Sequence, residues 1–505
     1  ESTVYGTLFD ADSLPLPFSN VSVQNVPVGT VADDNGYYEL NVPSGNELIL
    51  VYSHVGYKTQ KTSFIGKPGE RYLINQWLDE ELTSIEGVEV TAEKESSSTF
   101  VKIEIKDFEN IPNTSGNFET ILKTMGVSSN NELSSQYSVR GGNFDENLVY
   151  VNDIEIHRPF LIRSGQQEGL SFTNPDMVES VHFSAGGFDA QYGDKMSSVL
   201  DITYRKPKKF AASASASLLG GAAHVEGKTK NNKLTFISGV RYKTNRYLLG
   251  ALETKGDYKP SFIDVQSYIT YKPFKKFEIG FLGNFADNQY NFIPQTLETS
   301  FGTVRDALSF KVFYDGNERD RFQTGLGALS FSYRPNDELS LKIISSAFNT
   351  YERESFDIQG QYLINELDNR FGSETAGDSI LNIGIGTFMN HARNKLEANV
   401  FSIEHKGLYS TSDNDLRWGL QYRYESISDQ LSEWDVLDSA GYSIPYSDND
   451  VLLFNTRKGK SDLQSYRISG YLQNTYNFRK GRADYYLTTG LRAHYWSYNT
   501  QTVVS

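Results

Sequence analysis

The stretch "YSVRGGNFDENLVYVNDIEI", residues 137–156, contains a pair of glycines, an acidic turn and then an alternating apolar run. Successive side chains of an extended segment point to opposite faces. Leu148 and Tyr150 therefore lie on one face of the run, and Val149 and Val151 lie on the other. This run predicts a strand that follows the Arg-Gly-Gly turn.

The Arg140-Gly141-Gly142 triplet before this strand predicts a turn. Glycine supplies both a positive φ angle and room for a close approach of the backbone. The Arg140 guanidinium can pair bidentately with carboxylates. An RNA-binding repeat is the alternative for such a triplet. It is disfavoured because the triplet occurs once, in a chain of formal net charge −15, so no nucleic-acid partner is expected.

The composition of the 505 residues is unusual in its aromatic content. Aromatic residues make up 13% of the chain, but no run of about 18 apolar residues is long enough for a transmembrane helix. Transmembrane β-barrels combine the same two features, because lipid-facing and lumen-facing residues alternate and aromatic girdles mark both interfaces. Cysteine is absent, which excludes disulfides and thiolate metal sites.

Residues 208–505 show the alternation that a barrel requires. On one strand, Leu416, Trp418, Leu420, Tyr422 and Tyr424 point one way, and Arg417, Gly419, Gln421, Arg423 and Glu425 point the other. Similar alternation recurs along the segment and gives about 11 expected strands. A soluble β-sandwich array or propeller is the alternative architecture. Plugged transporters have 22 strands, and an odd, open set cannot close in lipid. We therefore expect about half of a barrel in this sequence.

The connections between these strands are expected to alternate in length. Short turns are expected at 230–232, 273–276, 334–337 and 478–482, and long connections at about 245–259, 289–322, 353–393 and 429–463. Outer-membrane barrels keep short turns in the periplasm and long loops outside the cell. Aromatic residues in the long connections are candidates for contacts with a ligand or a partner, or for girdle positions: Tyr351, Phe356, Tyr362, Trp434, Tyr442 and Tyr446.

The N-terminal part divides into two further segments. Residues 1–81 contain short strands separated by Pro, Asn and Gly turns, such as "GTVADDNGYYEL". They resemble the carboxypeptidase regulatory-like domain, a transthyretin-like β-sandwich without peptidase chemistry. Residues 82–99 follow as a charged, Ser-rich linker. Its piece "EGVEVTA" resembles the TonB box, an extended peptide that adds to a sheet edge of TonB; the residues concerned are Glu86, Val88, Glu89, Val90, Thr91 and Ala92.

Residues 100–207 are similar to the α/β plug domain of TonB-dependent outer-membrane receptors. The resemblance rests on "SVRGG" at 138–142, on "YVND" at 150–153 with Asn152 and Asp153, and on "AGGFDAQYGDKMSSVLDITYR" from 185, with Gly186 and Gly187. It implies a mainly β protein with a transthyretin-like sandwich, a plug and an antiparallel barrel. It also implies that plug charges such as Arg140 help to hold the plug inside the barrel.

The resemblance implies active import of an unidentified ligand across the outer membrane of a Gram-negative bacterium. The N-terminal domain would lie in the periplasm, TonB would bind residues 86–92, and lipids or lipopolysaccharide would surround the barrel. The pairing of the two domains is typical of Bacteroidetes receptors. The pieces "EVTAEK" and "YVNDIEI" depart from the SusC type, which argues against a standard SusC importer and its lipoprotein lid.

A different function remains open from the residues alone. The barrel could instead be a non-transporting subunit of an outer-membrane assembly or secretion complex, because a fold does not fix a function. A surface lipoprotein or the subunits of such a complex are further candidate partners.

Sequence signatures of catalysis are weak. There is no HExxH motif or nucleophile elbow. The piece "GAAHVEGKT" at 221–229 has the wrong glycine spacing for a phosphate loop. The acidic residues from Asp429 to Asp450 offer oxygen ligands for calcium, but a solvated loop explains them as well. No enzymatic activity, cofactor or metal site is expected.

Overall fold

The computed structural model describes residues 1–505 except 11–12, 25, 55–56, 80–99, 104–117, 129–135, 160–169, 245, 247–255, 304–305, 371, 451 and 481–482. The chain divides into two compact units, Glu1–Glu93 and Lys94–Ser505. The TonB-box-like residues 86–92 lie outside the described residues. Among the residues described, no helix is long and apolar enough to cross a membrane.

The first unit is a β-sandwich, which we call the N-terminal sandwich. One sheet has the order β4-β1-β7 with β8 also paired to β1, and the other has the order β3-β2-β5-β6. Alternate residues of β1 are buried, and apolar residues of the other strands join them in one core. The strands are β1 Ser2–Phe9, β2 Asn20–Val23, β3 Gly29–Val31, β4 Tyr37–Val42, β5 Glu47–Ser53, β6 Gln60–Ile65, β7 Arg71–Leu73 and β8 Gln76–Trp77.

The second unit begins with a small α/β part, which we call the central block. Its mixed sheet has the order β11-β10-β13-β12-β9, in which β10 and β13 are parallel. The elements are β9 Val101–Ile103, η1 Phe118–Met125, η2 Phe144–Glu146, β10 Asn147–Val151, β11 Ile154–Glu155, η3 Pro175–Met177, β12 Val178–Ser184 and β13 Ser198–Tyr204. The short helix expected over 117–125 is a 3₁₀ helix, η1.

The alternation predicted for 148–151 is confirmed. All of β10 is buried. Leu148 and Tyr150 pack on one side of the sheet with Tyr192, and Val149 and Val151 join a different core cluster.

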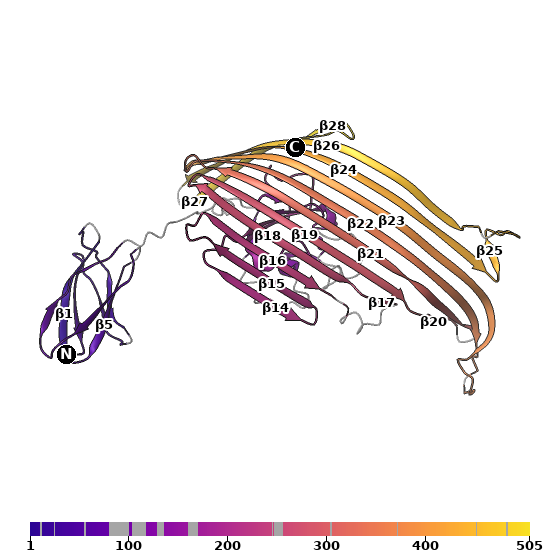
Figure 1. Ribbon diagram of the computed structural model, residues 1–505, viewed down its shortest axis with the longest axis horizontal. Helices are drawn as coiled ribbons and strands as arrows, with labels where there is room; N and C mark the ends of the chain where they lie inside the picture. The colour runs from indigo at the N-terminus through magenta and orange to yellow at the C-terminus, as the bar shows by residue number, and fades with distance from the viewer. Residues whose placement is uncertain are drawn as a thin grey trace. The chain divides into compact units, whose positions relative to one another are not determined.

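The remainder of the second unit is one antiparallel sheet, which we call the long sheet (Figure 1). Its path runs β14-β15-β16-β18-β19-β21-β22-β23-β24-β26-β27-β28, with β17, β20 and β25 attached beside it. The strands are β14 Ala211–Ser217, β15 Gly220–Lys228, β16 Leu234–Lys243, β17 Gly256–Tyr258, β18 Ser261–Phe274, β19 Phe277–Pro294, β20 Leu297–Gly302, β21 Ala307–Tyr333, β22 Leu339–Leu367, β23 Ser379–Ser410, β24 Asn414–Ser439, β25 Tyr442–Ile444, β26 Asn455–Lys480, β27 Ala483–Trp496 and β28 Gln501–Val504.

Two expectations about this sheet need correction. The path has one strand more than expected, because Gln501–Val504 pairs with β27 as β28. Most of the expected long connections are strand. β22 has 29 residues and β23 has 32, and they pair almost throughout. The parts of these strands that lie beyond the apolar region consist mainly of polar residues. Their sequences therefore lack the hydrophobic periodicity that indicates a strand, and loops were predicted there.

The long sheet has an inward and an outward face. Inward apolar residues share one core cluster with the central block: Ile237, Tyr268, Leu282, Leu326, Ala328, Ile344 and Phe348 of the sheet pack with residues such as Met177, Val181 and Ile202. Outward residues at the alternate positions are exposed, among them Phe281, Leu329, Ile343, Ile403, Leu420 and Ile468. The central block therefore packs against the inward face of the sheet.

Candidate functional site

The tip of the β10–β11 hairpin carries the predicted Asn152 and Asp153. Both residues have positive φ angles, 52° and 70°, as a two-residue type I′ turn requires. Asn and Asp tolerate this conformation better than other side chains. The turn is fastened to β13, because Asn152 Oδ1 accepts a hydrogen bond of 2.9 Å from Tyr204 N. The hairpin thus presents Asp153 in a defined position.

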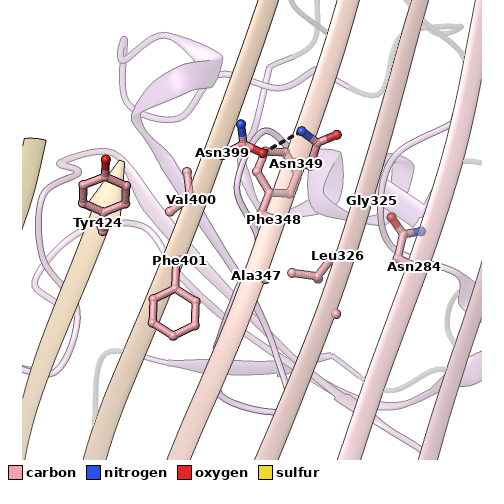
Figure 2. Close-up of a pocket in the computed structure, with 11 residues that line it drawn as sticks. Asn284, Gly325, Leu326, Ala347, Phe348, Asn349, Asn399, Val400, Phe401 and Tyr424 are labelled. Atoms are coloured by element: carbon pink, nitrogen blue, oxygen red, sulfur yellow. Dashed lines mark hydrogen bonds between the residues drawn. The ribbon is translucent and has the colours of Figure 1, made fainter. Parts of the chain in front are cut away.

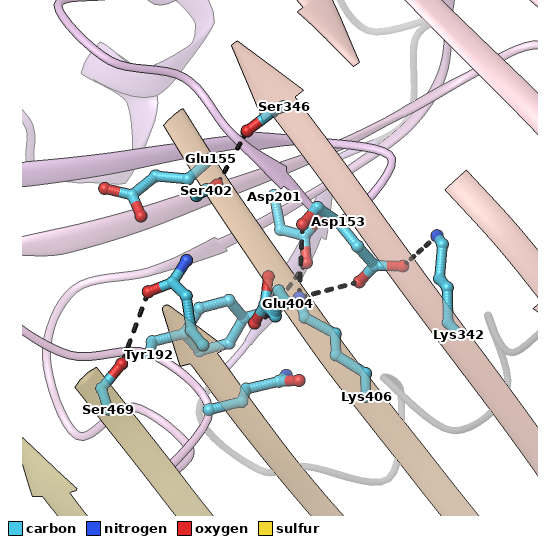
Figure 3. Close-up of polar contacts among 12 residues, drawn as sticks. Asp153, Glu155, Tyr192, Asp201, Lys342, Ser346, Ser402, Glu404, Lys406 and Ser469 are labelled. Carbon is cyan, nitrogen blue, oxygen red and sulfur yellow. Dashed lines mark hydrogen bonds and ion pairs between the residues drawn. The ribbon is translucent and has the colours of Figure 1, made fainter. Parts of the chain in front are cut away.

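Two lysines of the long sheet bind this tip. Lys342 Nζ of β22 lies 2.7 Å from Asp153 Oδ2 and donates a hydrogen bond of 3.1 Å to Asn152 O. Lys406 Nζ of β23 lies 3.7 Å from Asp153 Oδ1 and 3.6 Å from Glu404 Oε1. Figure 3 shows both lysines on either side of the Asp153 carboxylate. One carboxylate of the central block therefore joins two neighbouring strands of the sheet.

Beyond the tip, two further pairs link the central block to the sheet. Arg423 of β24 forms a hydrogen-bonded ion pair with Glu155 of β11, and both side chains are largely buried. Burial alone would raise the pKa of Glu155, but Arg423 and other cations outweigh it and lower the pKa. Arg158 pairs with Glu352 of β22 at 2.7 Å. The central block thus contributes charges of both signs.

His157 lies beside this group and stays neutral near pH 7. Its Nδ1 is 3.7 Å from Glu155 Oε1. Burial lowers the pKa of His157 to about 4, although Glu155 acts in the opposite direction. The imidazole therefore adds a polar contact and no charge to the interface.

The segment after β12 makes a second set of contacts. Gly186 and Gly187 have φ angles of 93° and 69°, so this segment turns where only glycine does so readily. Asp189 Oδ2 then lies 3.3 Å from Arg417 Nη1 of β24. Ala190 N donates to Gln473 Oε1 of β26 at 2.7 Å. The segment after β12 thus contacts β24 and β26, whereas Asp153 at the tip of the β10–β11 hairpin contacts β22 and β23.

The Arg140-Gly141-Gly142 turn confirms the expectation for its glycines. Gly141 has a φ angle of 82°. A Cβ on Gly142 would overlap the Ser197 hydroxyl. Arg140 is exposed and pairs with no carboxylate among the described residues, so its bridging role stays a prediction. Lys342, Lys406 and Arg423 form bridges among the residues that the structure describes.

A third anchor lies where β16 and β18 meet the segment before η3. Arg241 pairs with Asp264 at 2.9 Å, and both are buried. The same guanidinium donates to the carbonyl oxygens of Thr173 and Ser171 at 2.7 and 2.8 Å. Nearby, burial raises the pKa of Glu119 in η1 to about 7, although Ser171, Arg241 and Lys243 act against it.

The candidate aromatic residues are not brought together. Tyr351, Phe356 and Tyr362 lie on β22 and Trp434 lies on β24, so the expectation that they belong to loops is wrong. Tyr351 and Phe356 are five residues apart on an unbroken strand and point to opposite faces. Trp434 stacks on His391 with ring centroids 4.6 Å apart. Tyr442 of β25 and Tyr446 form a separate pair at 5.8 Å.

The sheet residues that contact the central block were not predicted as a site, although the sequence contains an indication of them. Arg417, Arg423 and Glu425 stand on the polar side of an alternating strand. Charged side chains on the inward face of a barrel strand need a partner. Which residue of the central block each one meets depends on contacts more than 180 positions apart, as for Arg158 and Glu352.

Comparison with known proteins identifies the two N-terminal parts. Residues 4–90 match the family model of the CarboxypepD_reg-like domain, and residues 92–199 match that of the TonB-dependent receptor plug domain. TonB-dependent receptor P39 of Formosa agariphila is 27% identical over 215 residues, which cover 41% of this chain and 20% of that protein. TonB-dependent receptor SusC of Bacteroides thetaiotaomicron is 25% identical over 256 residues, 48% of this chain and 24% of that protein.

Solved structures give weaker matches over more of the chain. The outer-membrane transporter YddB from Escherichia coli matches with a TM-score of 0.47 and 11% identity, covering 80% of this chain and 57% of YddB. The RagAB peptide importer also gives a TM-score of 0.47, with 10% identity over 81% of this chain and 56% of that chain. The alignments thus span about a quarter or less of the curated relatives and more than half of these two structures.

Proposed function

The chain carries the plug domain of the TonB-dependent receptors behind a carboxypeptidase regulatory-like domain, and from this premise we propose that it serves active import across the outer membrane. The central block is the plug, and the long sheet belongs to the barrel wall. The unidentified ligand would pass where the plug lies. Transport therefore requires that the plug move relative to the wall.

The observation that carries this proposal is the chemistry of the interface between plug and wall. Polar contacts hold the plug at the β10–β11 tip, at Asp189–Ala190 and at Arg241. These polar contacts can be exchanged for water when the interface opens, whereas the apolar contacts of the shared core have no such compensation. Several part-buried ion pairs still resist thermal opening, because each separated charge must find new partners.

The work that opens this interface must be delivered from the periplasmic side of the outer membrane. We propose that TonB supplies it by binding residues 86–92 as an added strand, because a β-prone segment can pair with a sheet edge. The segment precedes β9 in sequence, so a pull on it acts directly on the plug. We propose the same division of the chain as above, with 1–81 as the periplasmic domain, 82–99 as the linker, 100–207 as the plug and 208–505 as wall.

Disulfide trapping tests this proposal, because the chain has no cysteine. Single substitutions Val88→Cys, Glu89→Cys and Val90→Cys would each be combined with single cysteines along the edge strand of the TonB C-terminal domain. Strand addition predicts efficient trapping that alternates with residue position. Ser97→Cys in the linker is the control. Equal trapping at Ser97→Cys and Val88→Cys, or no trapping at 88–90, would remove the support for a TonB-driven importer.

A further inference from the structure

The outward face of the long sheet has an apolar belt of limited height. On β22 the outward apolar residues run from Leu339 to Ala347, and polar Asn349 follows. Nine residues of a strand span ~30 Å along its axis, and a tilted strand of this length matches the height of a lipid-facing band. On β23 the same boundary lies between Phe401 and Asn399, which is directly opposite Asn349.

A hollow of about 600 Å³ lies at this upper boundary. Gly325, Gly327 and Ala347 line it, together with the aromatic side chains of Phe401 and Tyr424, which Figure 2 shows on neighbouring strands. A Cβ on either glycine would meet no atom within 4 Å, so the space above both is open. Phe401 and Tyr424 are exposed on the outward face of the sheet, which places the hollow on that face.

A row of cations crosses the sheet just above the hollow. Arg321 pairs in register with Arg353, Arg353 with Lys395, Lys395 with Gln430 and Gln430 with Lys460. We call Arg321, Arg353, Lys395 and Lys460 the basic row. All four side chains are exposed. Arg321 is four residues beyond Gly325 on β21, or ~13 Å along the strand. The row therefore lies beyond the hydrocarbon edge, at the level of lipid headgroups.

The centre of the basic row lacks carboxylate partners. Arg353 donates a hydrogen bond of 2.6 Å to Tyr351 Oη, and its guanidinium lies over that ring. Lys395 has neither an ion pair nor a hydrogen bond to any residue that the structure describes. Yet Arg353 and Lys395 are directly opposite each other, an arrangement that is unfavourable for like charges.

Among the described residues, the ion pairs of the basic row lie at its two ends. Asp287 accepts two hydrogen bonds of 2.9 Å from Arg321. Asp462 lies 3.5 Å from Lys460. Asp357 pairs with Arg393 and His391, and Glu397 accepts a hydrogen bond from Asn399. An anion between Arg353 and Lys395 would relieve their repulsion.

We propose that this face binds a phosphorylated glycolipid of the outer leaflet, with a phosphate on Arg353 and Lys395 and an acyl chain in the hollow. The two features match the two halves of such a lipid. Arg and Lys favour phosphate through charge-assisted hydrogen bonds, and an open apolar hollow favours a hydrocarbon chain. The proposal rests on the outer-membrane location and does not depend on transport.

Lipid binding to the full-length protein tests the proposal directly. The protein would be placed in phosphatidylethanolamine nanodiscs that contain either bisphosphorylated or dephosphorylated lipid A, and bound lipid A would be counted by native mass spectrometry. We expect retention of the phosphorylated form. The double substitution Arg353→Glu/Lys395→Glu should reduce retention by about tenfold or more, since each charged hydrogen bond is worth about a factor of ten.

Two further variants separate the site from general attraction to charge. Lys230→Glu/Lys275→Glu makes the same charge change in turns at the opposite end of the sheet and should leave retention unchanged. Gly327→Leu places its Cβ in open space and projects the side chain into the hollow, so it should weaken retention while the basic row stays intact. Equal retention of the two lipid A forms, equal loss in the control, or no loss in Arg353→Glu/Lys395→Glu would each overturn the proposal.

Discussion

Each charged residue of the plug interface interacts with more than one charged neighbour, so the ion pairs form a network. Asp153 has two lysine partners, and Lys406 is shared with Glu404. Removing one member therefore leaves another charge without compensation, which costs more than the pair itself contributes. The energy of such a network is measured by double-mutant cycles and not by single substitutions.

We expect Asp153 and Lys342 to be coupled. Asp153→Asn and Lys342→Met should each increase the opening of the β10–β11 hairpin, and the double variant should open less than the sum predicts. Residues in one ion-pair network typically show coupling of about 0.5–3 kcal/mol. Amide hydrogen exchange of residues 147–155 measures it. Asp153→Asn combined with Lys275→Met, in a distant turn, should show additive effects; coupling in both cycles would point to a global change.

Glu119 should give the plug a dependence on pH. Burial raises its pKa from 4.5 to about 7 in the folded state, so the folded state holds a proton that the unfolded segment releases. This contribution to stability is present below pH 4.5 and decreases as pH rises toward 7. We expect exchange of the amides of η1 to quicken by more than about tenfold over this range, beyond the intrinsic change.

The matched variant for this test is Glu119→Gln, which keeps the shape and removes the titration. Its exchange, corrected for the intrinsic rate, should no longer quicken as pH rises from 4.5 to 7. His157→Gln tests the opposing contribution, because the lowered pKa of buried His157 makes stability rise with pH between about 4 and 6.5. If Glu119→Gln keeps the full pH dependence, another group is responsible.

The elements differ in how well the sequence predicted them. The 148–151 strand was predicted from its run of apolar residues, and the glycines at 141 and 142 indicated the turn before it. The upper halves of β22 and β23 were missed. These strands pair with each other over more than twenty positions. Backbone pairing of this kind does not require a pattern of apolar residues in the sequence of either strand. The partners of Arg423 and Lys406 were likewise set by tertiary contacts.

The outward belt predicts a contrast within β24. Leu420 is 59% exposed and faces outward inside the belt, whereas Gln430 is exposed ten residues later, beyond the belt. Leu420→Arg should destabilise the protein in a bilayer by about 2–4 kcal/mol if it lies near the midplane, and by less near an interface. Gln430→Arg should have little effect. Urea-dependent folding and unfolding of the full-length protein in liposomes measures the stability of both variants.

At the scale of the molecule, the two units should unfold separately. The N-terminal sandwich has its own core, and among the described residues this core shares no member with the cluster that joins plug and wall. Its centre includes Tyr38 and Tyr52, whose hydroxyl oxygens are 3.1 Å apart, and Tyr38 also donates to Ile74 O at 2.8 Å.

Tyr52→Ala should therefore unfold the sandwich selectively. Truncation of a large buried aromatic residue costs about 3–5 kcal/mol, which is a large fraction of the stability of a domain of this size. We expect rapid hydrogen exchange over residues 1–79 in Tyr52→Ala and unchanged exchange over 147–155. Tyr52→Phe, which keeps the ring and loses only the hydroxyl, should stay folded. Faster exchange of 147–155 in Tyr52→Ala would show that the plug depends on the sandwich, and TonB would then act on one mechanical unit in place of two.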